Sequence, residues 1–133
     1  MSTLPARIVH TSIKRDWREV YAFMANPENM AHWAHGLGSG LKRDGEDWIA
    51  DGGALGEVRV RFAPPNDFGV VDHDVKMSDG SVVHNALRVT PNGNGAEVMF
   101  VLLQRADQDA TAIEADAAAV AKDLATLKAL LER

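Results

Sequence analysis

The chain has 133 residues, a formal net charge of −5 at pH 7 and no cysteine. Its length predicts one domain, residues 1–133, and the missing cysteines exclude disulfides, thiolate catalysis and cysteine-ligated metal sites. The acidic balance without a Lys/Arg cluster argues against a nucleic-acid partner, and no run is apolar enough for a signal peptide or membrane span, so we expect a soluble, cytoplasmic protein.

The first part of the chain predicts a strand followed by a short helix. Arg7–Lys14 is rich in β-branched residues, which is typical of a strand. Asp16 lies three residues before Glu19 and is a candidate N-cap for the helix. The helix would have one apolar side, formed by Trp17, Val20, Tyr21, Phe23 and Met24.

A second short helix is predicted directly after the first. Asn26 is a good N-cap and Pro27 suits a first helical position, so this pair ends one helix and starts the next. The buried side of the second helix would carry Met30 and Trp33.

The middle of the chain has the pattern of an antiparallel meander. Gly, Asp and Asn recur about every eight to twelve residues between alternating segments. The predicted strands are Leu37–Arg43, Asp47–Asp51, Leu55–Ala63, Phe68–Met77, Ser81–Thr90 and Ala96–Gln104. The predicted turns are Asp44-Gly45, Pro64-Pro65-Asn66-Asp67, Asp79-Gly80 and Pro91-Asn92-Gly93-Asn94-Gly95. The last strand is apolar on both faces, which indicates a central strand or one that touches two layers.

The longest periodic segment is the last one, Asp109 to Glu132, which predicts a helix. Its apolar residues step by four and three positions into one narrow stripe of Ile113, Ala117, Val120, Leu124, Leu127 and Leu131. Thr111 with Glu114 could cap the helix, and Asp107 and Asp109 are alternative caps. Such a helix needs one surface to lie on, so we expect an α+β fold with the helix on the concave side of a curved antiparallel sheet. Space between sheet and helix would be the place for a functional site.

Three segments in this order resemble the START-like helix-grip superfamily, also called SRPBCC, in its bacterial polyketide cyclase/dehydrase-like branch. They are VHTSIKRDWREVYAFMANPENMAHWA, ALRVTPNGNGAEVMFVLL and AAAVAKDLATLKALLE, and the resemblance covers essentially the whole chain. The resemblance implies a seven-stranded antiparallel sheet around the C-terminal helix, with an apolar cavity for a lipid, aromatic or polyketide-like molecule. It implies no single reaction and no catalytic residue, because the superfamily includes carriers, receptors and cyclases.

The best candidate for chemistry is His73. Strand alternation places it on the face of Val71 and Val75, which should look into the cavity, while Asp72 and Asp74 point to the opposite face. An Asp–His dyad within this strand is therefore disfavoured. A neutral imidazole there could orient a ligand or move a proton during aldol-type cyclisation and dehydration. The alternative is a buried histidine that a neighbour or water satisfies.

Asn85 is the second candidate, because the same alternation places its amide on an apolar face. A buried amide needs partners, so Asn85 could orient a ligand oxygen or hydrogen-bond His73 if the two strands pair in that register. A shift of one residue would exchange the two faces. The neighbours expected on the opposite, solvated face are His84, Arg88 and Thr90.

Three further motifs carry weaker signals. His32 and His35 form an H-x-x-H without a third ligand of evident spacing, so we expect no metal site. The glycines of 36–40 follow a helix and precede a strand, which is backwards for a phosphate cradle and favours a flexible connection or a gate at the cavity mouth. Ser39 lacks the strand-to-helix context of a nucleophile.

The sequence therefore favours a monomeric or homodimeric protein that binds a hydrophobic or aromatic small molecule and uses no cofactor. The expected ligand contacts are Val60, Phe62, His73, Asn85, Phe100, Val120 and Leu124. One alternative is a polyketide cyclase or dehydratase with His73 as general acid/base. Another is a protein-interaction module that uses the outer sheet face around Arg59 and Arg61.

Overall fold

The computed structural model describes residues 1–35, 40–51 and 56–133, and these form one antiparallel sheet and three α-helices. The strands are β1 (Ala6–Ile13), β2 (Lys42–Asp44), β3 (Asp47–Asp51), β4 (Glu57–Phe62), β5 (His73–Lys76), β6 (Val82–Asn92) and β7 (Gly95–Leu103). The helices are α1 (Trp17–Met24), α2 (Met30–Trp33), which the 3-10 turn η1 (Pro27–Asn29) precedes, and α3 (Ala110–Leu131).

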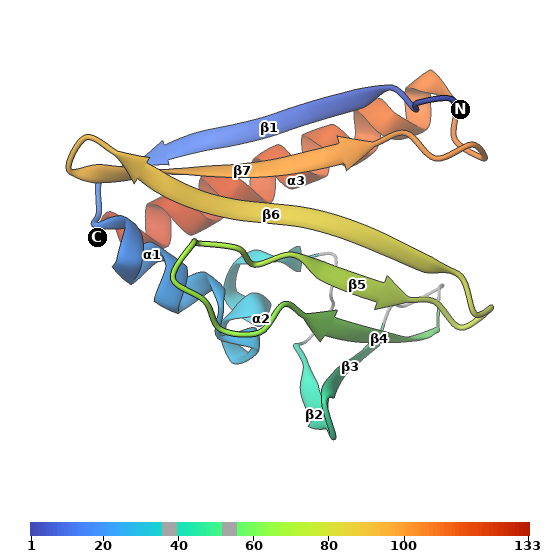
Figure 1. Ribbon diagram of the computed structural model, residues 1–133, viewed down its shortest axis with the longest axis horizontal. Helices are drawn as coiled ribbons and strands as arrows, with labels where there is room; N and C mark the ends of the chain where they lie inside the picture. Colours follow the sequence, from blue (N-terminus) through green and yellow to red (C-terminus); the bar gives the residue numbers. More distant parts are fainter. Residues whose placement is uncertain (36–39, 52–55) are drawn as a thin grey trace.

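The strands pair in the order β1-β7-β6-β5-β4-β3-β2, so the first strand lies beside the last. The sheet is curved, and α3 lies behind its β1–β7 side, where it packs against β1, β7 and α2 (Figure 1). This arrangement confirms the predicted α+β class with a seven-stranded curved sheet and a long C-terminal helix. We call the sheet face toward α3 the inner face. None of the helices in the described ranges is long and apolar enough to cross a bilayer.

Side-chain caps set where the helices begin. The Asp16 carboxylate accepts a hydrogen bond from the Arg18 amide at 2.9 Å, and the Asn26 side chain accepts one from the Glu28 amide at 3.0 Å. The second predicted helix begins as the 3-10 turn η1. Asp109, not Thr111, caps α3, because its carboxylate accepts from the Ala112 amide at 2.8 Å.

The apolar stripe of α3 is buried at both ends and partly open in the middle. Ile113, Leu124, Leu127 and Leu131 are buried, whereas Ala117 and Val120 keep part of their surface exposed. Leu124, Leu127 and Leu131 belong to the main core cluster, together with Ile13, Val20, Met24, Met30, Trp33, Val71, Leu87, Val89, Ala96 and Val98. The C-terminal half of α3 is therefore anchored against α1, α2 and the sheet.

The segment between β4 and β5 differs from its prediction. A strand was expected over Phe68–Met77, but only His73–Lys76 is one. Asn66 organises the preceding loop: its side-chain oxygen accepts from the Phe68 and Val70 amides, and its amide nitrogen donates to the carbonyls of Pro64 and Val70. These side-chain bonds hold the segment in a loop, in which Val70 makes an isolated bridge to Arg88, and the strand begins late, at His73.

Two further features fix this loop in place. The Tyr21 hydroxyl on α1 accepts a hydrogen bond from the backbone N–H of Asn66 at 3.0 Å. Gly69 has φ +74°, and an added Cβ would lie 2.0 Å from the Val89 carbonyl oxygen on β6. The backbone of the loop therefore touches β6 directly, just before the chain reaches His73.

The predicted turns are close to the observed ones, whereas the strand predicted over Leu37–Arg43 is found only at Lys42–Asp44, and residues 40 and 41 are not part of it. Gly45 and Gly80 have positive φ in the β2–β3 and β5–β6 connections. The expected loop tip at 91–95 is tighter, because β6 runs to Asn92, which pairs with Gly95 across a two-residue turn. Residues 36–39 lie outside the described residues. They include the start of the strand predicted over Leu37–Arg43, Ser39 and most of the 36–40 glycine segment.

The outer face of the sheet carries paired charges and some apolar residues. Arg59 pairs with Asp44, and Arg61 donates to Asp47 at 2.7 Å. β7 pairs with β1 on one side and β6 on the other, so it is an internal strand. Within the described residues no second layer fully covers its outer-face side chains, which keep part of their surface exposed: Met99, Val101 and Leu103.

Candidate functional site

Three side chains form a row across the inner face. The strand register pairs Phe62 of β4 with His73 of β5, and His73 with Asn85 of β6. Directly opposed residues in an antiparallel pair share a face, so the three side chains are neighbours. The rings of Phe62 and His73 are 5.3 Å apart between centroids and tilted by 41°. The pairing of His73 with Asn85 is the register that the sequence left open.

His73 is held in one tautomer. Its side chain is 7% exposed, and Nδ1 lies 3.0 Å from the Val71 carbonyl oxygen. A carbonyl oxygen only accepts hydrogen bonds, so Nδ1 carries the proton. Burial lowers the pKa of His73, which the bond to Val71 opposes only in part, so the ring is neutral near pH 7. Nε2 therefore presents a lone pair.

Asn85 faces that lone pair. Its amide nitrogen lies 3.4 Å from Nε2 of His73, at the long end of the hydrogen-bond range. The amide nitrogen and not the carbonyl oxygen must be on this side, because two acceptors would repel each other. The pair is thus oriented but leaves room for a stronger donor at Nε2.

The lowered pKa of His73 predicts a pH-dependent stability. The unfolded imidazole takes up a proton below about pH 6.5 that the folded one does not, so the free energy of unfolding should fall as the pH drops through the folded pKa. The contribution is fully present only above about pH 6.5, the pKa of the unfolded imidazole, and no more stability is lost below the folded pKa. Urea unfolding between about pH 7.5 and pH 5 should show a shallower decline for His73→Gln than for the unchanged protein. Equal declines would contradict a buried neutral imidazole.

The two aspartates beside His73 face away from it, as the alternation predicted. Asp74 accepts from the His84 ring at 2.6 Å on the outer face. Asp72 accepts from the Leu87 amide at 3.0 Å and from Arg88 at 2.9 Å. Burial raises the pKa of Asp72, but the hydrogen bond and the charge of Arg88 outweigh it, so this pKa lies below its usual value. Asp72 thereby ties the start of β5 to β6 and positions His73 without touching its ring.

The other predicted contact residues divide into two groups. Phe62, Phe100 and Val120 pack against the edge of the main core cluster and are partly buried. Leu124 belongs to that cluster, and Val60 is fully buried opposite Val75. The first group, with Asn85, therefore has surface that a ligand can reach. Leu124 and Val60 are covered by protein.

Trp33 is a feature that the sequence did not distinguish from ordinary core. Its side chain is 3% exposed, and its indole nitrogen has no hydrogen-bond partner in the part of the chain that the structure describes. Buried donors are nearly always paired, so this N–H marks a place where an acceptor such as water would be bound. No sequence signal separates a paired indole from an unpaired one.

The H-x-x-H motif does not converge on one point. His35 Nδ1 lies 3.0 Å from the Asp123 carboxylate, and His32 is exposed. Within residues 1–35, 40–51 and 56–133, no three His, Asp or Glu side chains lie close enough together to hold a metal ion.

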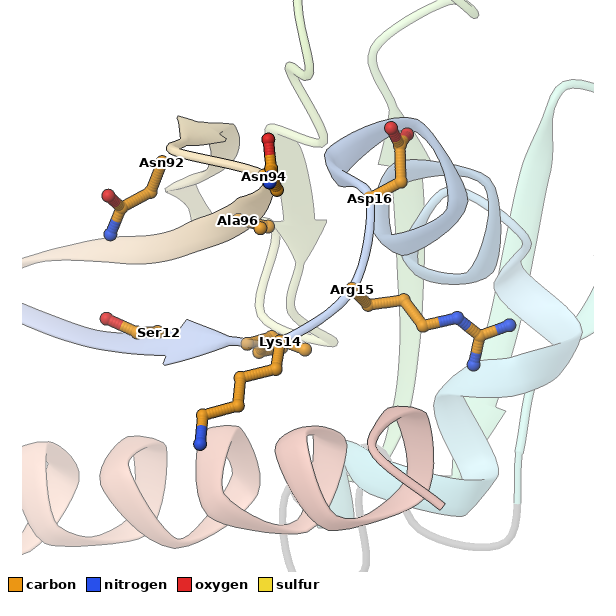
Figure 2. A pocket seen from close by; sticks show the side chains of 9 residues that line it. Ser12, Lys14, Arg15, Asp16, Asn92, Asn94 and Ala96 are labelled. Atoms are coloured by element: carbon orange, nitrogen blue, oxygen red, sulfur yellow. The ribbon is translucent and has the colours of Figure 1, made fainter.

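A surface depression of about 540 Å³ lies at the C-terminal end of β1, beside the turn between β6 and β7 (Figure 2). It is lined by Ser12, Ile13, Lys14, Arg15, Asp16, Asn92, Asn94, Gly95 and Ala96, and shares no residue with the His73 row. Two of its charged side chains are engaged within the protein: Arg15 binds Glu19 and the Leu131 carbonyl, and Asp16 caps α1. We therefore place the candidate site at the His73 row.

No family model matches the sequence, and a comparison with curated protein sequences finds no match either. Solved structures do match. DynU16, a protein from the dynemicin biosynthetic locus, has TM-score 0.72 and 13% identity over 96% of this chain, which spans about half (47%) of DynU16. CV1439 from Chromobacterium violaceum has TM-score 0.69 and 18% identity, over 96% of this chain and 98% of that one.

A third similar structure is BH1534 from Bacillus halodurans, with TM-score 0.71 and 11% identity over 99% of this chain and 100% of that one. Identities this low show a common fold and nothing about activity. Together with the curved seven-stranded sheet and the long C-terminal helix, they show that this chain has a helix-grip fold.

Proposed function

We propose that this protein binds a hydrophobic or aromatic small molecule on the inner face, between the His73 row and the middle of α3. The observation that carries this proposal is an oriented polar pair on an otherwise apolar face, the buried His73 and the partly buried Asn85. Binding sites for such molecules are mostly apolar, with a few placed polar groups that fix orientation. Phe62 is partly exposed and supplies apolar surface next to that pair, and Phe100 and Val120 are partly exposed as well.

The energetics suit a ligand of moderate affinity. Covering one apolar side chain contributes about 1–2 kcal/mol, so a handful of such contacts would give roughly micromolar binding after the cost of association. Val60 and Leu124 would hold the floor of the site in place, and the two polar side chains would set the ligand's orientation.

A second candidate function is cyclisation or dehydration of a polyketide-like substrate. The observation in its favour is the lone pair on Nε2 of His73, which is available as a general base near pH 7. The protein-interaction alternative has less support, because Arg59 and Arg61 of the outer face are already paired with Asp44 and Asp47.

Binding of the neutral fluorescent probe N-phenyl-1-naphthylamine tests the leading proposal. Val120→Phe would fill the space beside the middle of α3 and should raise the dissociation constant of the probe about tenfold or more, equivalent to about 1.4 kcal/mol. The matched control is Ala121→Phe, which adds the same ring to the exposed neighbour of Val120. The proposal fails if the probe does not bind, or if both variants bind it as the unchanged protein does.

A further inference from the structure

The inner-face site has a hydrogen-bonding pattern that selects among ligands. Nδ1 of His73 is committed to the Val71 carbonyl, so Nε2 can only accept. The Asn85 amide beside it can only donate from the nitrogen that faces Nε2, and its 3.4 Å separation leaves that bond weak. One acceptor and one donor thus lie side by side, next to the Phe62 ring.

We propose that the ligand carries a hydroxyl group, phenolic or enolic on an aromatic or conjugated body, that donates to Nε2 of His73 and accepts from the amide of Asn85. This inference rests on the proposed function and names the class of ligand for that site. A hydroxyl is the small group that both donates and accepts, so it satisfies both partners at once.

Other oxygen groups fit the pattern poorly. A ketone or an ether oxygen only accepts, so it would face the lone pair of Nε2 with no proton between them. A carboxylate would also bring a charge to a site where burial already disfavours one. Neither group could use the acceptor, which would then stay unpaired at a cost. The charged side chains nearest in sequence, Asp72 and Asp74, lie on the other side of the sheet and are paired there.

The neighbouring Phe62 supports an aromatic body for the ligand. Its ring lies 5.3 Å from the imidazole and is tilted by 41°, so the two rings form a corner and not a parallel stack. A flat ligand ring that lies along Phe62 would place an attached hydroxyl near the imidazole edge, where Nε2 is found.

Three naphthalene derivatives separate the possibilities in a calorimetric titration. 2-Naphthol has the donor, 2-methoxynaphthalene has the oxygen without the proton, and 2-naphthoate has acceptors and a charge. We expect the unchanged protein to bind 2-naphthol about tenfold more tightly than 2-methoxynaphthalene or unsubstituted naphthalene, and 2-naphthoate most weakly. His73→Phe should abolish the advantage of the hydroxyl, so that 2-naphthol and naphthalene bind this variant with similar dissociation constants.

The outcomes distinguish this inference from the function on which it rests. If naphthalene and 2-naphthol bind equally well to the unchanged protein, the hydroxyl inference is wrong and the binding proposal stands. If none of the compounds binds, both are wrong. Tighter binding of 2-naphthoate or 2-methoxynaphthalene would also overturn the inference.

A measurement on the unchanged protein avoids dependence on a variant that folds poorly. Nitrogen-15 NMR of histidine-labelled protein should show His73 as the neutral Nδ1–H tautomer at pH 7. Addition of 2-naphthol should shift the Nε2 resonance, whereas naphthalene should leave it in place. An Nε2–H tautomer, or an Nε2 resonance that 2-naphthol does not move, would overturn the inference.

Discussion

Replacing Gly69 by alanine should lower the free energy of unfolding by about 3 kcal/mol, the sum of a conformational penalty and a steric one. Its φ of +74° costs an L-residue about 1–2 kcal/mol. The new Cβ would also lie 2.0 Å from the Val89 carbonyl oxygen, so the loop must move away from β6. That movement disrupts the 2.9 Å hydrogen bond from the Val89 amide to the Gly69 carbonyl. Urea unfolding followed by circular dichroism measures the loss.

Gly45→Ala is the matched control for this change. Gly45 has a similar φ of +63°, but an added Cβ would meet nothing within 4 Å. Its substitution should cost only the conformational part, about 1–2 kcal/mol. If the two variants lose the same stability, the loop does not touch β6 as described. The comparison bears on the site, because this loop delivers the Val71 carbonyl that fixes the His73 tautomer.

Leu127→Ala should lower the free energy of unfolding by about 2–5 kcal/mol, the range for deleting a fully buried leucine side chain. Leu127 is 0% exposed and lies in the part of α3 that packs on α1, α2 and the sheet. The substitution would leave a cavity where these elements meet. The same unfolding measurement detects the effect.

Val120→Ala provides the contrast within the same helix stripe. Val120 is partly exposed, so folding buries only part of its side chain. Its truncation should therefore lower the free energy of unfolding by less than about 1 kcal/mol. A loss of 2 kcal/mol or more, roughly that of a fully buried side chain, would mean that the middle of α3 is packed against the sheet with no accessible surface. The binding proposal would then lose its apolar wall.

The elements that local chemistry specifies could be predicted from the sequence. α3 followed from its apolar period, β3 matched Asp47–Asp51, and the Asp16 and Asn26 caps were read from side chains that bond the nearest amides. Each depends on residues a few positions apart.

Features that depend on distant contacts were not predictable. Nothing local says that the stripe of α3 is covered at Ile113 and Leu124 but open at Val120, since this depends on which strands lie beneath it. The late start of the strand expected over Phe68–Met77 depends on Tyr21 and Val89, which hold the preceding loop from two other elements.

The candidate site shows the same division. Alternation placed His73 and Asn85 on one face, and the register then brought them together. The tautomer of His73 depends on the carbonyl of Val71, two residues earlier in the chain. The sequence does not show that this carbonyl points toward the imidazole ring. The indole of Trp33, which has no hydrogen-bond partner among the described residues, likewise depends on what surrounds α2.

The pairing of β1 with β7 has a consequence for how the chain is made. Ala6 lies opposite Leu103 and Ile13 opposite Ala96, so β1 finds its neighbour only after β7, the last strand in the described residues, has been synthesised. Until then its backbone amides and carbonyls have no ladder partner on that side. A nascent chain halted before residue 95 therefore lacks the strand that joins its two halves, and it would expose β1 to chaperones or to other unfinished chains.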